Sequence, residues 1–528
     1  MKSQTPCRNE KSESSLRFSC LSDKNAQNPT DLSLCLSDKK IKESRHLNYS
    51  LNLRHFASRV VSLAFRHYKD VQMAAMVRLF SLVCCFAVAF NLPADEVDLR
   101  VSGPNTLGQK VDVRLEIRGN VSAEFDGESA TSLPMEVDGH FTFRERQLRS
   151  AQSTRYIREY QAATARIDYG RGQEQSVLAK GNEWIIADRR IDSEQSKRVR
   201  YLTSTGGLTQ SELDLLTIPA STLVWDRMLE ATKVTTGKKW SPQNELLADV
   251  LTIDKLQKNS VQLEMGQVQN GIATIHITGE ATGLIDDAET EIRVQGTCDF
   301  DLTAGYTRSL RLTLQENRTI CESAPGYDAV VKLEMRVSRP SADVLPQSEI
   351  ETSGLDKRKW TDYLVLQNKT NEFKLRHDRR WRLITNEGQT ALLRYVDGNM
   401  LLGQCTIQYL SQLPSPDAYT AEAFRRDVTK TTADQGQIAD AQNFTTARGM
   451  NVMQIDVKGK VNDIEVTWRY YHVTQPDGQR LSYVVTFDTE IASRFEGVDR
   501  RLIDSVDFIR TGESRRGTIN ASTTLKPK

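Results

Sequence analysis

From residue 97 onward, apolar and polar residues alternate with a period of two over long stretches of the chain. The clearest alternation covers residues 111–118, 310–315 and 331–338, where Val, Leu, Ile and Met alternate with charged or polar residues. Because successive side chains of a strand point to opposite faces, each of these strands has one apolar and one polar face. This pattern is typical of antiparallel sheets with one solvated face. We therefore predict a long antiparallel sheet over residues 97–340.

Two amphipathic segments are predicted to cover the apolar face of that sheet. The first is a helix after Ser241 and Pro242, an N-cap followed by a proline in the first turn. The second spans residues 223–229. Helices against one face of a curved sheet give either a filled core or a cavity for an apolar ligand. The residues predicted to form such an apolar-ligand face are Trp225, Leu246, Val250, Phe300, Leu312 and Leu333.

A second domain is predicted after a break in the pattern. Pro340, Pro346 and Gly354 fall in this break, so residues 341–356 are interpreted as a linker. Residues 357–510 then predict an antiparallel sheet with helices at 419–432 and 498–506. Its hairpin, 392–396 with 400–410, turns at Asp397-Gly398. The predicted fold class is thus α+β, with two domains, each a largely antiparallel sheet covered by helices, and a disordered tail at 511–528.

A secretory signal peptide is predicted at residues 76–94. The apolar run 79–90 follows one positive charge, Arg78, and contains Ala87-Val88-Ala89, a small-x-small cleavage pattern. The run is shorter than the roughly 20 residues that span a bilayer. Residues 1–75 are polar and are predicted to be disordered. They are interpreted as the result of a misassigned translation start. The alternatives are an unusually long n-region of the signal peptide and an organellar presequence. We expect an exported protein, periplasmic or extracellular, with no transmembrane segment in the mature chain.

Charge and cysteine content exclude several classes of protein. With 70 Lys+Arg and 69 Asp+Glu, the chain has no net field that would attract nucleic acid. Only Cys298, Cys321 and Cys405 lie in the predicted mature part, too few for a disulfide scaffold. A disulfide between Cys298 and Cys321 is one possibility. It is disfavoured because a turn near residues 304–305 would place Cys298 opposite a residue near Arg311.

The sequence offers no local constellation for catalysis, a cofactor or a metal. His140, His276, His377 and His472 show no i, i+4 pairing, and no two cysteines have zinc-ribbon spacing. Cys405 falls on an apolar strand position, where a thiol is a small hydrophobe.

Two further groups of residues are interpreted as structural. Asp286-Asp287 are interpreted as solvated turn residues. Four aromatic residues are predicted to form a cross-strand ladder within a core: Trp468, Tyr470, Tyr483 and Phe487.

The two halves resemble known families to different degrees. Residues 357–510 resemble the PsbP-like fold through Trp381, the strand at 403–405, the run 468–472 followed by Gly478, and the segment 495–508. That resemblance implies a non-catalytic adaptor or assembly factor. Residues 97–340 loosely resemble the half-barrels of LolA-like lipoprotein carriers, which implies at most that acyl chains bind between sheet and helices.

These observations predict an exported, non-enzymatic envelope protein that binds a protein partner or an apolar small molecule. Two alternatives stay open. One is a periplasmic hydrolase whose site is assembled from residues distant in sequence, and the other is a structural component of the cell surface.

Overall fold

The computed structural model describes residues 96–509, with gaps at 102–107, 124–129, 149–152, 171–172, 179–183, 191–198, 205, 322–323, 341–342, 353–358, 369, 371, 398–399, 433–434, 462 and 496. The predicted signal peptide, the segment that precedes it and the tail at 511–528 lie outside the described residues. The described chain is mainly β with a few helices, and the predicted α+β class is confirmed.

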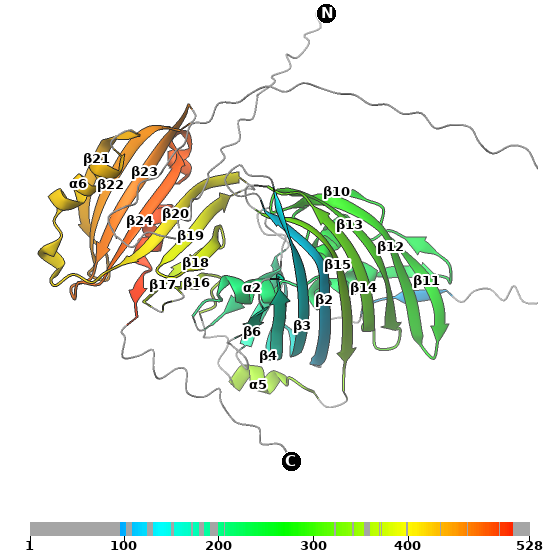
Figure 1. Cartoon of the computed structure of the whole chain (residues 1–528). Coiled ribbons are helices and arrows are strands. Elements are labelled where there is room, and N and C mark those ends of the chain that lie inside the picture. The colour runs from blue at the N-terminus through cyan, green and yellow to red at the C-terminus, as the bar shows by residue number, and fades with distance from the viewer. Residues whose placement is uncertain are drawn as a thin grey trace, which may run out of the picture. The chain divides into compact units, whose positions relative to one another are not determined.

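The first part of the chain forms one antiparallel sheet of thirteen strands, the large sheet (Figure 1). Its main strand order is β7-β6-β4-β3-β2-β15-β14-β13-β12-β11-β9, while β5 pairs with β4 and β10 with β12. The strands are β2 (Gln109–Ala123), β3 (Thr131–Leu148), β4 (Ser153–Asp168), β5 (Gln173–Val177), β6 (Trp184–Arg190), β7 (Arg200–Thr203), β9 (Lys239–Trp240), β10 (Lys255–Asn259), β11 (Gln262–Gln269), β12 (Ile272–Ile285), β13 (Ala288–Asp301), β14 (Tyr306–Arg318) and β15 (Gly326–Ser338). A separate pair joins β1 (Val97–Leu99) to β8 (Ala231–Val234).

The predicted alternation is confirmed in the large sheet. In β15, for example, Val331, Leu333 and Met335 are buried, whereas Lys332 and Glu334 are exposed. The buried side chains form one hydrophobic cluster with α2 (Gln210–Leu216), α3 (Thr222–Leu229) and α4 (Asn244–Leu251). These helices therefore cover the apolar face of the sheet, as predicted for α3 and α4, whereas α2 was not predicted.

The start of α4 differs from the prediction. Its N-cap is Gln243, not Ser241, and Gln243 has extended backbone angles. The residue before a proline avoids helical angles, and here the chain stays extended past Pro242 as well. The proline therefore precedes the helix and lies outside its first turn.

The second part of the chain forms a seven-stranded antiparallel sheet, the C-terminal sheet, in the order β18-β19-β20-β24-β23-β22-β21. Its strands are β18 (Trp381–Glu387), β19 (Thr390–Asp397), β20 (Met400–Leu410), β21 (Gly436–Thr445), β22 (Asn451–Val461), β23 (Ile464–Thr474) and β24 (Arg480–Asp488). A small sheet of β16 (Leu364–Gln367), β17 (Phe373–His377) and β25 (Asp507–Phe508) accompanies it. The helices are η2 (Pro416–Ala418), α6 (Ala421–Thr432), η3 (Thr489–Arg494) and α7 (Val498–Asp504).

The C-terminal sheet is buried on both faces. One hydrophobic cluster lies between the sheet and α6, and another contains residues of η3, α7 and the small sheet. The predicted aromatic ladder is wrong as a single row: Trp468 and Tyr470 belong to the α6 cluster, whereas Tyr483 and Phe487 belong to the other. All four side chains are buried, as predicted.

Part of the segment interpreted as a linker is packed. It contains α5 (Gln347–Thr352), and Leu345 and Ile350 are buried together with Ile157 of β4. Arg146 of β3 pairs with Asp343 at 2.6 Å and donates to the carbonyl of Leu345 at 2.6 Å. Residues 343–352 are thus held against the large sheet.

Candidate ligand-binding face

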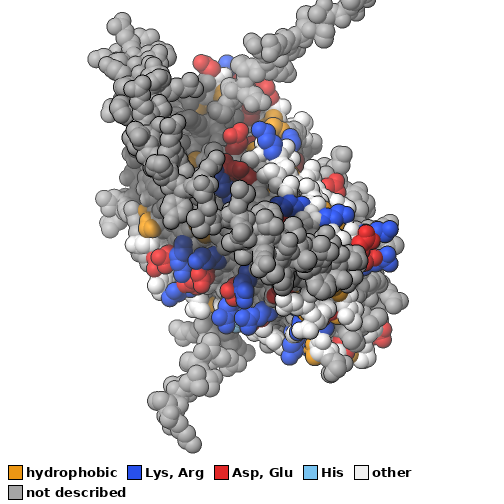
Figure 2. All heavy atoms as spheres, turned by 90° about the vertical axis from the view of Figure 1, so that its right-hand side faces the viewer, with side chains coloured by type: hydrophobic (Ala, Val, Ile, Leu, Met, Phe, Trp, Pro, Cys, Tyr) orange, Lys and Arg blue, Asp and Glu red, His pale blue; other side chains and the backbone are white. Residues whose placement is uncertain are grey.

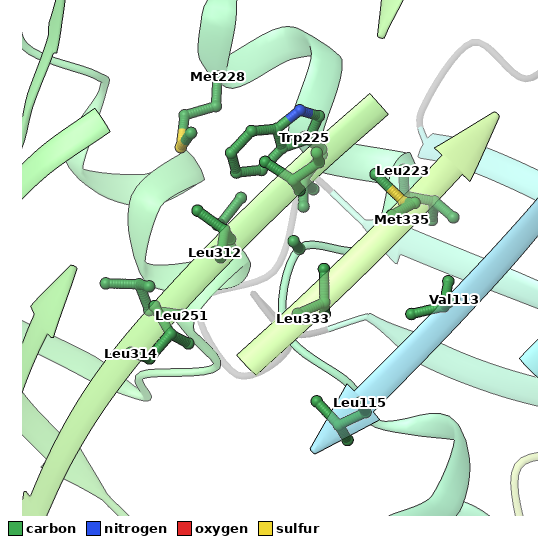
Figure 3. Close-up of a cluster of buried hydrophobic side chains, with 14 of the residues drawn as sticks. Val113, Leu115, Leu223, Trp225, Met228, Leu251, Leu312, Leu314, Leu333 and Met335 are labelled. Carbon is green, nitrogen blue, oxygen red and sulfur yellow. The ribbon is translucent and has the colours of Figure 1, made fainter. Parts of the chain in front are cut away.

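The structure brings the six residues of the predicted apolar-ligand face into one buried cluster. They come from two helices and three strands: Trp225 (α3), Leu246 and Val250 (α4), Phe300 (β13), Leu312 (β14) and Leu333 (β15). None is more than 4% exposed. Figure 3 shows the indole of Trp225 beside Leu312 of the sheet, with Leu333 and Met335 on the next strand. Side chains of the helices and of the sheet therefore share the space between them.

The apolar face continues beyond the buried cluster to a half-buried margin. We call this margin the rim and define it by five residues that pack against the cluster: Ile117, Val121, Ile167, Tyr169 and Tyr327. Val121 of β2 pairs directly with Tyr327 of β15, and Ile117 pairs with Val331 of the buried cluster. Solvent therefore reaches the end of a face whose other end is fully buried.

A charged network that the sequence reading missed lies under the N-terminus of α3. Arg158 donates through Nε to Glu145 at 2.8 Å and through Nη2 to Thr222 at 2.8 Å, and Thr222 donates in turn to Glu145 at 2.9 Å. Gln109 donates to the other carboxylate oxygen of Glu145 at 2.6 Å. Both members of the ion pair are almost completely buried. Each charge thus has charge-assisted partners, which a buried ion pair requires.

The network was detectable in the sequence as polar residues in apolar positions. Gln109 lies two residues before Val111, so it is in phase with the apolar positions of its strand. Glu145 likewise lies two residues after Phe143 and is in phase with the apolar positions of β3. Charged residues in that phase are predicted to lie on the apolar face.

A second polar group lies on the same face, beside the middle of α3. Asp226 accepts the backbone N–H of Thr307 at 3.2 Å, and the Thr307 hydroxyl lies 3.5 Å from the sulfur of Cys298. Burial raises the pKa of the Cys298 thiol to about 12, although the neighbouring Thr307 hydroxyl and Trp225 indole favour the thiolate. The Trp225 indole N–H lies near this sulfur but has no partner of proper hydrogen-bond geometry among the described residues.

The other sequence-predicted residues occupy separate places. Cys405 is buried, and burial raises its pKa well above the usual value. Cys298, Cys321 and Cys405 form no disulfide, and Cys298 pairs with Leu310, one residue from the predicted position. Asp286 and Asp287 form the turn between β12 and β13, both with positive φ, as expected for a two-residue hairpin turn.

His276 is exposed on the polar face, as predicted, and lies directly opposite Glu264. It borders a surface hollow of about 370 Å³ near the β9 edge of the large sheet, lined by Thr236, Gly237, Glu264, Met265, Gly266, Gln267, Thr274 and His276. Within the described residues, no three His, Cys, Asp or Glu side chains gather as metal ligands. Among the residues that the structure describes, no helix has the length and apolar character to cross a membrane.

The polar face of the large sheet carries charges of both signs. Asp138 of β3 accepts hydrogen bonds from Arg118 at 2.6 Å and from Arg166 at 2.5 Å, and His140 lies 3.2 Å from Asp112. Figure 2 shows positive and negative side chains interspersed over one side of the molecule, with few apolar side chains. The charged side chains of this face are therefore solvated.

Comparison with known proteins gives only remote structural likenesses. No family model matches the chain. No curated protein matches it either. Cyanobacterial PsbP from Synechocystis sp. PCC 6803 is similar over 28% of this chain and 92% of its own, with 10% identity and a TM-score of 0.22.

Two other solved structures show similar values. A protein of unknown function from Pseudomonas aeruginosa, PA94, matches over 27% of this chain and 94% of its own, with 10% identity and a TM-score of 0.20. A protein from Bacteroides thetaiotaomicron VPI-5482 shares 9% identity over 28% of this chain, with a TM-score of 0.21, and the match spans about half of that protein's length (49%). The PsbP-like likeness is therefore distant, and at these TM-scores it contributes nothing to the argument on function.

Proposed function

We propose that this chain is an exported, non-enzymatic binding protein of the cell envelope whose ligand is an apolar small molecule held between the large sheet and the helices α3 and α4. The observation that carries the proposal is the continuous apolar face, fully buried under the two helices and half-exposed at the rim. Transfer of apolar surface from water stabilises a complex by about 25 cal/mol per Å². A ligand would enter at the rim, pass along Leu314 and Leu333, and displace side chains of the two helices as it does so.

The helices are suited to such a displacement because each is short and has few polar attachments. Helix α3 is held at its start by Ser221 and Thr222, in its middle by Asp226, and further on by Arg227, which donates to Thr154 of β4. In α4, Val250 accepts the N–H of Ala220, and Asp249 pairs with Arg189. Most of their attachment is therefore apolar packing, which an apolar ligand can replace.

Native mass spectrometry of the purified full chain tests this function. The expected result is co-purifying lipid, or uptake of added hexadecane, that disappears when the face is filled by a Leu333→Trp substitution. A matched control is Lys332→Trp, which alters the adjacent residue of β15 on the polar face. Failure of the full chain to take up any apolar molecule would overturn the proposal.

A protein-binding scaffold is the second candidate. The observation that favours it is that the six predicted residues all belong to one buried hydrophobic cluster, with none more than 4% exposed. If the face is permanently filled, the remaining surfaces for a partner are the polar faces and the sheet edges. The uptake experiment decides between the two functions.

A further inference from the structure

We infer that the outer edge of β21 is a homodimer interface, at which β21 of a second copy of this chain pairs antiparallel about a two-fold axis at Gln442. The inference goes beyond the proposed function and does not depend on it. It follows from the backbone groups that this edge leaves free and from the position of two charges without partners.

The first observation is that β21 is the last strand of the C-terminal sheet (Figure 1). Its ten residues contain no Lys, Arg or Pro, which commonly protect an edge, and their only charge is Asp440. The opposite edge differs, because Asn386 of β18 donates to the carbonyl of Gln367 in β16 at 2.9 Å. At one edge of the large sheet, Thr203 exchanges two backbone hydrogen bonds with Thr361. Among the described residues, β21 is thus a long edge without such a partner.

The second observation concerns the backbone groups of β21 that point outward. Thr446 donates its N–H to the carbonyl of Met450 at 2.9 Å, so these residues form a hydrogen-bonded pair at the end of the β21–β22 hairpin. Hydrogen-bonded and non-hydrogen-bonded pairs alternate along an antiparallel ladder. In the register of β21 with β22, the backbone groups that point away from β22 therefore belong to residues 441, 443 and 445. These groups are available to another strand.

The third observation is a pair of charges that lack partners among the described residues. Asp440 accepts the N–H of Ala441 at 2.9 Å, but no cationic side chain pairs with it there. The guanidinium of Arg500 in α7 lies 3.3 Å from the centre of the Phe444 ring, and no described carboxylate pairs with it. Asp440 and Phe444 lie on the same face of β21 but four residues apart, about 14 Å along the strand. This spacing separates Asp440 from Arg500 within one copy.

A two-fold axis at Gln442 brings these charges together. Antiparallel pairing about this axis places Asp440 opposite Phe444 of the second copy, with their Cα atoms about 4.5 Å apart. The Arg500 that is stacked on that Phe444 then meets Asp440, and the symmetry forms this ion pair twice. An axis at Asp440 itself would place two carboxylates opposite each other, which is unfavourable.

The same axis also satisfies the outward backbone groups. It places Ala441 opposite Asn443 of the second copy, and both residues point their N–H and carbonyl groups away from β22. When Asp440 turns to Arg500, it releases the N–H of Ala441 for the carbonyl of that Asn443. Charge pairing and backbone pairing therefore select the same register.

Sedimentation velocity of the full chain over a range of concentrations tests the inference. We expect a monomer–dimer equilibrium with a dissociation constant in the micromolar range. Asp440→Arg and Arg500→Asp each place like charges against one another twice, so each should raise the dissociation constant about tenfold. The double variant restores the ion pair with its charges exchanged and should dimerise like the wild type. Lys332→Glu, on the polar face of the large sheet, is the matched control and should leave the dissociation constant unchanged.

Asn443→Pro tests the backbone pairing separately. Because the N–H of Asn443 points away from β22, proline costs the monomer no hydrogen bond of the ladder, but it removes a donor from the dimer. We expect the dissociation constant to rise more than tenfold. Circular dichroism shows whether each variant is folded, and the charge variants decide if this one is not.

Two results would overturn the inference. One is a wild-type chain that stays monomeric at every concentration, including one whose β21 edge pairs with a different protein. The other is a dimer whose dissociation constant is unchanged in both single charge variants. Neither result bears on the uptake of apolar molecules, so the proposed function is tested independently.

Discussion

The large sheet and the C-terminal sheet are both antiparallel, but they bury their side chains differently. In β12 and β15, buried and exposed residues alternate, because helices cover one face and solvent the other. In β23, eight of the eleven residues are buried, since hydrophobic clusters lie on both faces. The orientation of β12 and β15 can therefore be read from their sequence, whereas that of β23 cannot.

Both regions also attach a helix to a sheet through a buried carboxylate and an arginine. In the large sheet Glu145 and Arg158 hold Thr222 of α3, and in the C-terminal sheet Asp499 of α7 accepts from Arg469 at 2.8 Å. Arg158 is more deeply buried than Arg469, which also binds Asp456.

The largest expected effect in this comparison is that of Glu145→Ala. It leaves Arg158 as a buried charge without its carboxylate, so we expect the free energy of unfolding to fall by about 3–5 kcal/mol. Asp499→Ala should cost less, about 2–3 kcal/mol, because Arg469 keeps Asp456 and partial contact with water. Urea unfolding of each variant measures both values. Equal losses would mean that the depth of burial of the arginine does not matter here.

Alanine substitutions at adjacent positions test the difference in burial directly. We expect Leu333→Ala to destabilise by about 2–5 kcal/mol and its neighbour Lys332→Ala by less than about 0.5 kcal/mol. In β23, Tyr470→Ala and Tyr471→Ala should both cost about 2–4 kcal/mol, because the two side chains occupy opposite buried faces. Thermal unfolding followed by circular dichroism provides the values. If Tyr470→Ala left the stability unchanged, it would contradict the burial of β23 on both faces.

The C-terminal region should lose stability in mild acid. His472 is 3% exposed, and burial, followed by the charge of Arg480, lowers its pKa to about 4. The unfolded state, with a pKa near 6.5, binds its proton first as the pH falls. Stability is therefore complete above about pH 6.5 and declines towards pH 4, by roughly 3 kcal/mol at most.

The measurement is urea unfolding at several pH values for the wild type and His472→Leu. In the variant, the free energy of unfolding should depend much less on pH between pH 6.5 and pH 4. His377 is also buried with a lowered pKa and accounts for part of what remains. If the free energy of unfolding of His472→Leu depends on pH as strongly as that of the wild type, other groups cause the acid sensitivity.

The smallest effect is expected on the polar face of the large sheet. Asp138→Ala removes the carboxylate shared by Arg118 and Arg166, but all three side chains are partly exposed. Water solvates the remaining charges, so the loss should be about 1 kcal/mol or less. Because Asp138 and Glu145 lie on the same strand, the pair of variants shows how the two faces of one sheet differ. A loss equal to that of Glu145→Ala would show that the polar face is not solvated.

The sequence predicted the elements that have one buried and one solvated face, because their apolar and polar residues alternate regularly. The strands around Leu312 and Leu333 and the helix around Trp225 are where they were expected, and so is the convergence of the six predicted residues. The strand β21 was missed because residues 439–443 are exposed and lack an apolar alternation. The aromatic ladder was assigned to one face because alternation carries no information where both faces are buried.

Two further features depended wholly or in part on contacts between residues that are distant in the sequence. The composition of residues 341–356 indicates a linker, yet Leu345 finds a buried place against Ile157, nearly two hundred positions away in the chain. Glu145 and Arg158 are charged residues that a composition-based reading assigns to solvent. Their burial follows only from the alternating phase of Glu145 and from its partners on α3.

The pairing of β2 with β15 has a consequence for how this molecule reaches its native state. Val113 of β2 lies opposite Met335 of β15, so two central neighbours in the sheet come from opposite ends of the first region. Such non-local pairing closes a very long loop and makes folding slow. During synthesis, one edge of β2 stays unpaired until β15 has emerged, about two hundred residues later. We therefore expect chains that end before Ser338 to aggregate and to depend on chaperones.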